Sequence, residues 1–62
     1  MAIYRLYVVT SGIVEEVSVV LFDDDAEAIE HAKDWARGRP VEIWESDRLV
    51  AQLAPPAAEG HD

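Results

Sequence analysis

Apolar residues alternate with polar ones in four stretches of the chain and recur at helical spacing in a fifth. Ala2–Thr10 and Val14–Phe22 are rich in Val, Ile, Leu and Tyr, residues that suit the pleated surface of a strand. Asp24–Arg37 switches to the period of an amphipathic helix. Two shorter strands are predicted at Val41–Glu45 and Arg48–Leu53. The predicted element order is therefore ββαββ.

The connections between these elements favour two antiparallel hairpins. Turns are expected at residues 11–12 (Ser-Gly) and 46–47 (Ser-Asp). Gly38 is expected as the residue just beyond the helix, and Pro40 prevents the helix from continuing. The predicted fold class is α+β: a four-stranded antiparallel sheet with one helix packed on one face.

One helix covers one face of a sheet, so the other face must be polar or covered by something else. Strict alternation assigns a nearly all-apolar set to the helix side: Tyr4, Leu6, Val8, Val17, Val19, Leu21, Val41, Ile43, Leu49, Ala51 and Leu53. The opposite set is mixed but contains three aromatic residues: Ile3, Arg5, Tyr7, Val9, Ser18, Val20, Phe22, Glu42, Trp44, Arg48, Val50 and Gln52.

An open face with this much aromatic and aliphatic area is unusual for a monomer, and aromatic residues are enriched at protein interfaces. We therefore expect this face, or an unpaired sheet edge, to pack against a second copy. The predicted interface residues are Tyr7, Val9, Val20, Phe22, Trp44, Arg48 and Val50. Two alternatives remain open: the C-terminal tail folds over the face, or the face is an apolar surface without a partner.

The closing hairpin offers one specific contact on that face. Trp44 and Arg48 are expected to project to the same side, where a guanidinium can stack on an indole. Glu42 lies two residues from Trp44 and can pair with an arginine. The stack either stabilises the hairpin locally or contributes to the interface, since Trp and Arg are common interface hot spots.

Length and charge narrow the function classes. The chain has 62 residues and no cysteine, so one small domain (1–53) must be stable without disulfides or thiolate metal sites. Residues 54–62 form an Ala- and Pro-rich tail that we expect to be disordered. Oligomerisation is the remaining way to stabilise so small a domain, and a homodimer is predicted.

The net charge is −8, with 13 acidic and 5 basic residues. This charge disfavours nucleic acid and anionic membrane surfaces as partners, because both require Lys and Arg. No signal peptide or membrane-spanning run of about 20 apolar residues is recognised, so a cytoplasmic location is expected.

The acidic run that precedes the helix has two interpretations. Asp24 and Glu27 have the spacing of a capping box, and Asp23 is a competing N-cap. The remaining acids complement the positive end of the helix dipole. A divalent-cation site needs several oxygen ligands that converge, whereas consecutive aspartates at a strand-to-helix junction point in different directions. We therefore predict no bound metal and no cofactor.

The helix itself predicts packing and no chemistry. Ala28, Ile29, Ala32, Trp35 and Ala36 form one buried stripe, with Ile29 and Trp35 as the large anchors. His31 lies at the edge of this stripe. It is either a general base oriented by Glu27 or, as we prefer, a boundary residue in a contact between neighbouring turns.

No phosphate-binding glycine loop, HExxH, GxSxG or paired Cys/His spacing is present, and His61 lies in the tail. We therefore expect no catalytic residues and no enzymatic activity.

Three segments of the chain resemble short bacterial proteins of unknown function. These segments are YRLYVV (Tyr4–Val9), DDDAEAIEHA (Asp23–Ala32) and VEIWESDRLVAQL (Val41–Leu53), and together they cover most of residues 3–53. The shared features are a Tyr-rich first strand, an acidic helix start and a closing hairpin with Glu42, Trp44, Arg48 and Val50. The resemblance implies a ββαββ domain and brings no activity or catalytic residue to this chain.

Two functional hypotheses follow from the sequence. The first is a non-catalytic interaction or structural module that associates with itself through its open sheet face or edge. The alternative is a protein that binds a small ligand or a metal at a dimer interface near Tyr7, Trp44 and Arg48.

Overall fold

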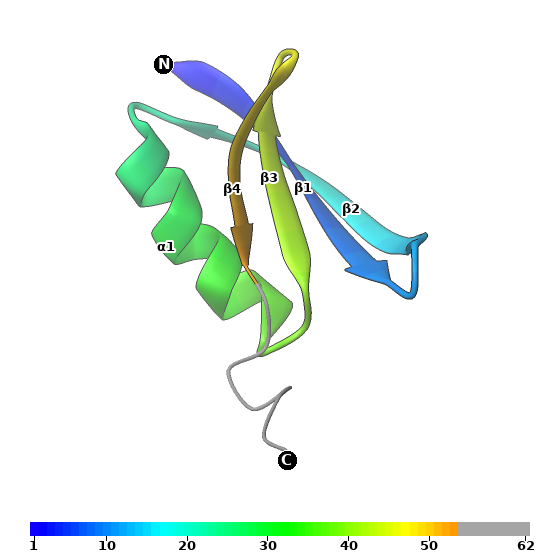
Figure 1. The fold of residues 1–62 in the computed structure, drawn as a ribbon. Helices are drawn as coiled ribbons and strands as arrows, with labels where there is room; N and C mark the ends of the chain where they lie inside the picture. The colour runs from blue at the N-terminus through cyan, green and yellow to red at the C-terminus, as the bar shows by residue number, and fades with distance from the viewer. Residues whose placement is uncertain (54–62) are drawn as a thin grey trace.

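The predicted ββαββ order is confirmed in a computed structural model, which describes residues 1–53. The elements are β1 (Ala2–Thr10), β2 (Ile13–Phe22), α1 (Asp25–Ala36), β3 (Val41–Glu45) and β4 (Arg48–Leu53) (Figure 1). The four strands form one sheet in the order β2-β1-β3-β4, and every neighbouring pair is antiparallel. The predicted disorder of residues 54–62 and the position of His61 lie outside the described residues.

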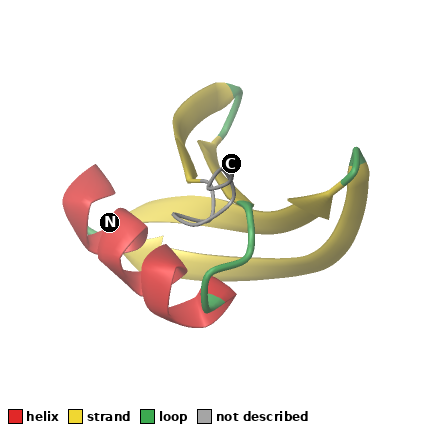
Figure 2. Cartoon of the chain, turned by 60° about the horizontal axis from the view of Figure 1, so that its bottom comes forward, coloured by secondary structure: helices red, strands yellow, loops and turns green. Residues whose placement is uncertain are grey.

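The helix lies on one side of the sheet only, and the tips of both hairpins project away from it (Figure 2). β1 is central and joins the two hairpins, because it pairs with β2 on one side and with β3 on the other. The link that follows the helix is tied to β1 where the Val9 N–H donates to the Pro40 carbonyl at 3.1 Å. β2 and β4 are left as the two edges of the sheet.

The core lies between α1 and the two central strands. Its buried side chains are Tyr4, Leu6, Val8, Val41 and Ile43 from the sheet and Ala28, Ala32 and Ala36 from the helix. Three alanines on one stripe let the helix backbone approach the sheet closely, and the prediction is confirmed for these three positions. Ile29 and Trp35 are only partly buried at its borders. The expectation that Trp35 is a buried anchor was too strong.

Asp24 is the N-cap of α1, which settles the choice between the two aspartates. Its carboxylate accepts a hydrogen bond from the Glu27 N–H at 2.9 Å. The Glu27 carboxylate reaches back to the Asp23 N–H at 3.3 Å, one residue earlier than in a standard capping box. At the other end the left-handed cap is Arg37 (φ 54°), followed by Gly38 (φ 83°).

A β-bulge interrupts the first hairpin close to its turn. Next to the turn, Val9 pairs with Val14. One residue further from the turn, Val8 of β1 pairs with Glu16. Glu15 is therefore an extra residue in β2. Because side chains alternate with a period of two, one extra residue moves every following side chain of β2 to the opposite face.

This bulge overturns the predicted faces of β2. Val20 pairs with Tyr4, and both Val20 and Phe22 pack against the core on the helix side. Val17, Val19 and Leu21 instead lie on the open face, where they are exposed. The sequence could not settle this choice because β2 is apolar on both faces, so alternation fits either register.

A second bulge interrupts the closing hairpin. Ile43 pairs with Ala51, whereas the next residue, Trp44, pairs with Leu49. Val50 is the extra residue, and it packs against the core. The predicted placement of Val50 on the open face was therefore wrong, and so was the placement of Leu49 on the helix side.

The two-residue turn at Ser46 and Asp47 sets the side on which Arg48 lies. Arg48 pairs with Glu45 across the hairpin, on the helix side of the sheet. Arg48 therefore lies on the side opposite to Trp44, and the predicted Trp44–Arg48 stack does not form.

Candidate interaction surface

The sheet face opposite the helix is an exposed apolar surface, called here the open face. Ladder partners project to the same side of a sheet, so the register defines its members. Nine are apolar or aromatic: Ile3, Tyr7, Val9, Val14, Val17, Val19, Leu21, Trp44 and Leu49. The aliphatic side chains of Ile3, Val14, Val17, Val19, Leu21 and Leu49 are between 44% and 64% exposed. A surface of this kind marks an interaction site more often than free solvent contact.

Among residues 1–53, the open face carries two charged strand residues, Arg5 and Glu42, and their charges cancel. Arg5 donates to the Tyr7 hydroxyl at 3.2 Å and to the Ser46 carbonyl, and its guanidinium lies 5.9 Å from the centre of the Tyr7 ring. The Trp44 indole N–H donates to Glu42 at 3.1 Å. Glu42 is thus held by an indole, not by an arginine as the sequence suggested.

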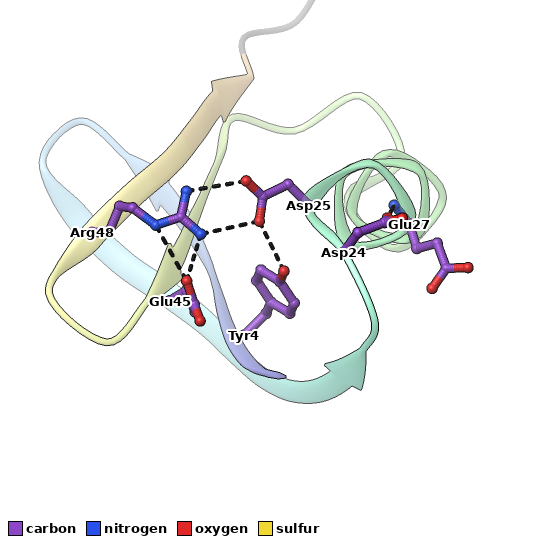
Figure 3. A network of polar contacts seen from close by, with 6 residues as sticks. All are labelled: Tyr4, Asp24, Asp25, Glu27, Glu45 and Arg48. Carbon is purple, nitrogen blue, oxygen red and sulfur yellow. Dashed lines mark hydrogen bonds and ion pairs between the residues drawn. The ribbon is translucent and has the colours of Figure 1, made fainter. Parts of the chain in front are cut away.

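The helix side of the sheet holds a network of polar side chains that sequence reasoning missed (Figure 3). Arg48 donates two parallel hydrogen bonds to the Asp25 carboxylate, at 3.0 and 3.1 Å. It also donates to Glu45, once at 3.2 Å and once over a shorter distance. The Tyr4 hydroxyl donates to Asp25 at 2.8 Å. This network joins the first turn of α1 to β1 and to the β3–β4 hairpin.

The pKa shifts in this network hold Tyr4, Asp25 and Arg48 in fixed protonation states. Burial, reinforced by the hydrogen bond to Asp25, raises the pKa of Tyr4 to about 12. Hydrogen bonds from Arg48 and then from Tyr4 lower the pKa of Asp25 below its ordinary value. Hydrogen bonds to Asp25 and then Glu45 raise the pKa of Arg48 further. Near neutral pH Tyr4 therefore stays protonated, Asp25 stays ionised and Arg48 stays positively charged. A general acid or base, in contrast, has a pKa near the working pH.

The predicted interface residues divide between the two sides of the sheet. Tyr7, Val9 and Trp44 share the open face, as their predicted positions require. The other four lie on the helix side: Val20, Phe22 and Val50 in the core border and Arg48 in the polar network.

Several functional candidates were missed because of the bulges. Val17, Val19, Leu21 and Leu49 belong to the open face although alternation assigned them to the core. The sequence did hold one signal for the polar network: a tyrosine placed under the helix needs a partner for its hydroxyl. His31, in turn, is exposed and packs its ring against Phe22, with 5.3 Å between ring centres.

A cavity of about 500 Å³ lies where the C-terminal end of α1 meets β4. Two basic residues, Lys33 and Arg39, line it beside apolar side chains. Arg39 bonds Glu16 at 3.0 Å and donates to the carbonyls of Ala36 at 2.8 Å and Trp35 at 3.3 Å. With these donors engaged inside the fold, Arg39 is not positioned as an anion receptor.

Two other kinds of site can be assessed over residues 1–53. No three His, Asp or Glu side chains in this range are grouped closely enough to hold a metal ion together. The one helix in this range is too short to cross a bilayer. Comparisons with family models, curated proteins and solved structures return no significant match. The shape and charge of the molecular surface therefore carry the functional inference.

Proposed function

We propose that the chain is a small non-catalytic interaction module that forms a homodimer through the open face. The observation that carries the proposal is the separation of charge from apolar area. The chain has a net charge of −8, yet its most apolar exposed surface carries one arginine and one glutamate. Two copies can therefore bring their open faces together without setting acidic side chains against each other. On the rest of the surface, repulsion between acidic side chains would oppose such a contact.

The size of the open face fits a small interface. β1 and β2 contain 9 and 10 residues, β3 and β4 contain 5 and 6. With about 3.3 Å per residue and about 4.8 Å between strands, these 30 residues cover roughly 500 Å² in projection. Side-chain relief raises the accessible area toward the roughly 600 Å² per partner at the low end of specific interfaces. Association at this low end of interface sizes is expected to be weak and dependent on concentration.

The geometry of such a dimer follows from the packing of sheets. Two sheets that pack face to face keep their strands within about 30° of each other, with their inner side chains interleaved at about 10 Å separation. Each helix then lies on the outside, so the assembly has the helix-sheet-sheet-helix layers of a small closed core. The open face of one chain thereby becomes buried without any rearrangement of its own fold.

The alternative, a ligand or metal site at a dimer interface, was predicted near Tyr7, Trp44 and Arg48. Arg48 lies on the other side of the sheet and is engaged by Asp25. No observation among the described residues favours that alternative over the dimer. The absence of catalysis and the cytoplasmic location stay predictions.

Sedimentation equilibrium with two lysine variants tests the proposal. Val19 and Ile13 lie on the same strand, are 64% and 65% exposed, and project to opposite sides of the sheet. The wild-type chain should sediment at twice its 6.9 kDa mass in the micromolar range. Val19→Lys should be monomeric there, and Ile13→Lys should remain dimeric. A wild-type monomer at high micromolar concentration contradicts the proposal, as does a Val19→Lys variant that associates like the wild type.

A further inference from the structure

The outer edge of β2 is a second unpartnered surface, separate from the open face. β2 pairs only with β1, so the backbone N–H and C=O groups along its other side have no strand beside them among residues 1–53 (Figure 1). Edges of this kind are templates for pairing with another chain, and folded proteins commonly shorten, bend or charge them.

The two edges of this sheet differ in that respect. β4 has 6 residues, begins at the ion-paired Arg48 and contains the bulge at Val50. β2 has 10 residues, and beyond its bulge the stretch 17–22 (VSVVLF) contains no charge, proline or glycine. This regular, β-branched stretch is the part of the sheet best suited to accept a further strand.

Charge at both ends of β2 indicates what kind of strand fits. Glu15 and Glu16 precede the uncharged stretch, and Asp23 and Asp24 follow it. Asp24 caps the helix and Glu16 pairs with Arg39. Glu15 accepts one exposed hydrogen bond, from the Thr10 hydroxyl at 3.3 Å, and the Asp23 carboxylate has no partner among residues 1–53. Glu15 and Asp23 are therefore the two charges most able to meet a partner. Eight positions separate them, which at about 3.3 Å per extended residue spans at most roughly 26 Å.

The two most symmetric pairings with a second copy of β2 set acidic residues against each other at this edge. An antiparallel pair centred on residue 19 brings the Glu15 end of one strand against the Asp23 end of the other. A parallel pair in register sets Glu15 beside Glu15 and Asp23 beside Asp23. Like charges directly opposite each other destabilise a strand pair, so both arrangements are unfavourable.

We propose that the edge of β2 binds an extended segment of another protein, with an apolar, β-branched centre and a Lys or Arg at each end, about eight positions apart. Main-chain hydrogen bonds to β2 supply the affinity, and the two acidic ends select the basic flanks. This inference goes beyond the homodimer, because edge and open face are different surfaces that two partners can occupy at once.

The probe for this edge is a synthetic peptide of about nine residues, with lysine at both ends and alternating threonine and valine between them. Binding to the full chain is measured by fluorescence anisotropy of a labelled peptide. Two further versions carry N-methyl groups on alternate residues, one version on the odd-numbered and the other on the even-numbered positions of the peptide. A strand added at an edge bonds along one side only, so one frame should abolish binding and the other should retain it. Equal effects of the two frames overturn the proposal.

The protein-side test exchanges the flanking charges. The double variant Glu15→Lys with Asp23→Lys should bind the lysine-flanked probe at least tenfold more weakly and gain affinity for a glutamate-flanked probe. The matched control is Glu30→Lys with Asp34→Lys, which changes the net charge equally on the exposed side of the helix. If the control loses as much affinity as the edge variant, net charge and not this edge governs binding, and the proposal fails.

Discussion

The placement of Val19 and Val20 on opposite faces of β2 can be tested with one substitution made at each position. Val19 is 64% exposed on the open face, whereas Val20 packs against the core under the helix. Threonine is β-branched like valine and similar in volume, so Val→Thr keeps the strand preference and replaces a methyl group by a hydroxyl. The two variants therefore differ mainly in where that hydroxyl lies.

The expected cost follows from burial. A hydroxyl placed in an apolar environment without a partner costs about 1–3 kcal/mol in proteins. Val20 is partly and not wholly buried, so Val20→Thr should cost about 1–2 kcal/mol, and Val19→Thr should cost less than about 0.5 kcal/mol. For a domain of this size the whole stability is about 3–8 kcal/mol, so the difference is a substantial fraction of it.

Urea unfolding followed by tryptophan fluorescence measures both variants. The experiment is run at protein concentrations below the dissociation constant of the dimer, so that burial of Val19 against a second copy does not contribute. A Val19→Thr variant that loses as much stability as Val20→Thr would refute the bulge at Glu15. Larger losses at Val19 would indicate the uninterrupted register in which Val19 faces the helix.

Two further predictions concern the start of the helix and its polar network. Asp24→Ala should lower stability by about 1 kcal/mol because the Glu27 N–H loses its partner, whereas Asp23→Ala should cost much less; urea unfolding compares the two. For Asp25, the folded pKa is lowered from 3.8, so its contribution to stability is present above pH 3.8 and is lost as the pH falls through the folded value. For Tyr4, the raised pKa means that stability is present below pH 10 and is lost between pH 10 and about 12. Thermal melts measured across pH should show both losses of stability. Asp25→Asn should reduce the fall in melting temperature at low pH, because the titrating carboxyl is gone.

The local signals in the sequence were sufficient for the elements and the helix. The Ala28–Ala32–Ala36 stripe has an unambiguous period, and the structure buries all three residues. The acidic run has the spacing of a cap, and Asp24 is the cap. Turn and cap chemistry acts within a few residues, so it can be read from sequence without knowing what lies across the fold.

Strand faces depend on pairing partners, and the sequence could not determine them. Without Glu15 as an extra residue, the turn would pair Leu6 with Val17, and alternation would place Val17 under the helix, as predicted. With the bulge, Leu6 pairs with Ser18. Both registers bury apolar side chains of β2. One register turns Val17 and Val19 toward the helix, and the other turns Val20 and Phe22 toward it. When a strand is apolar on both faces, its sequence pattern is the same with or without a bulge, so the bulge cannot be recognised from the sequence.

The same two bulges produce the surface on which the proposed dimer depends. The bulge at Glu15 sends Val17, Val19 and Leu21 to the open face. The bulge at Val50 lets Leu49 lie there beside Trp44 while Ala51 and Leu53 stay on the helix side. Over residues 1–53 the open face becomes more apolar than alternation predicts, and Arg5 and Glu42 are its charged strand residues. Either register of β2 leaves apolar side chains on the open face, because Val20 and Phe22 would replace Val19 and Leu21 there. An apolar face that persists in both registers is expected if a partner covers it, and this supports the proposed self-association.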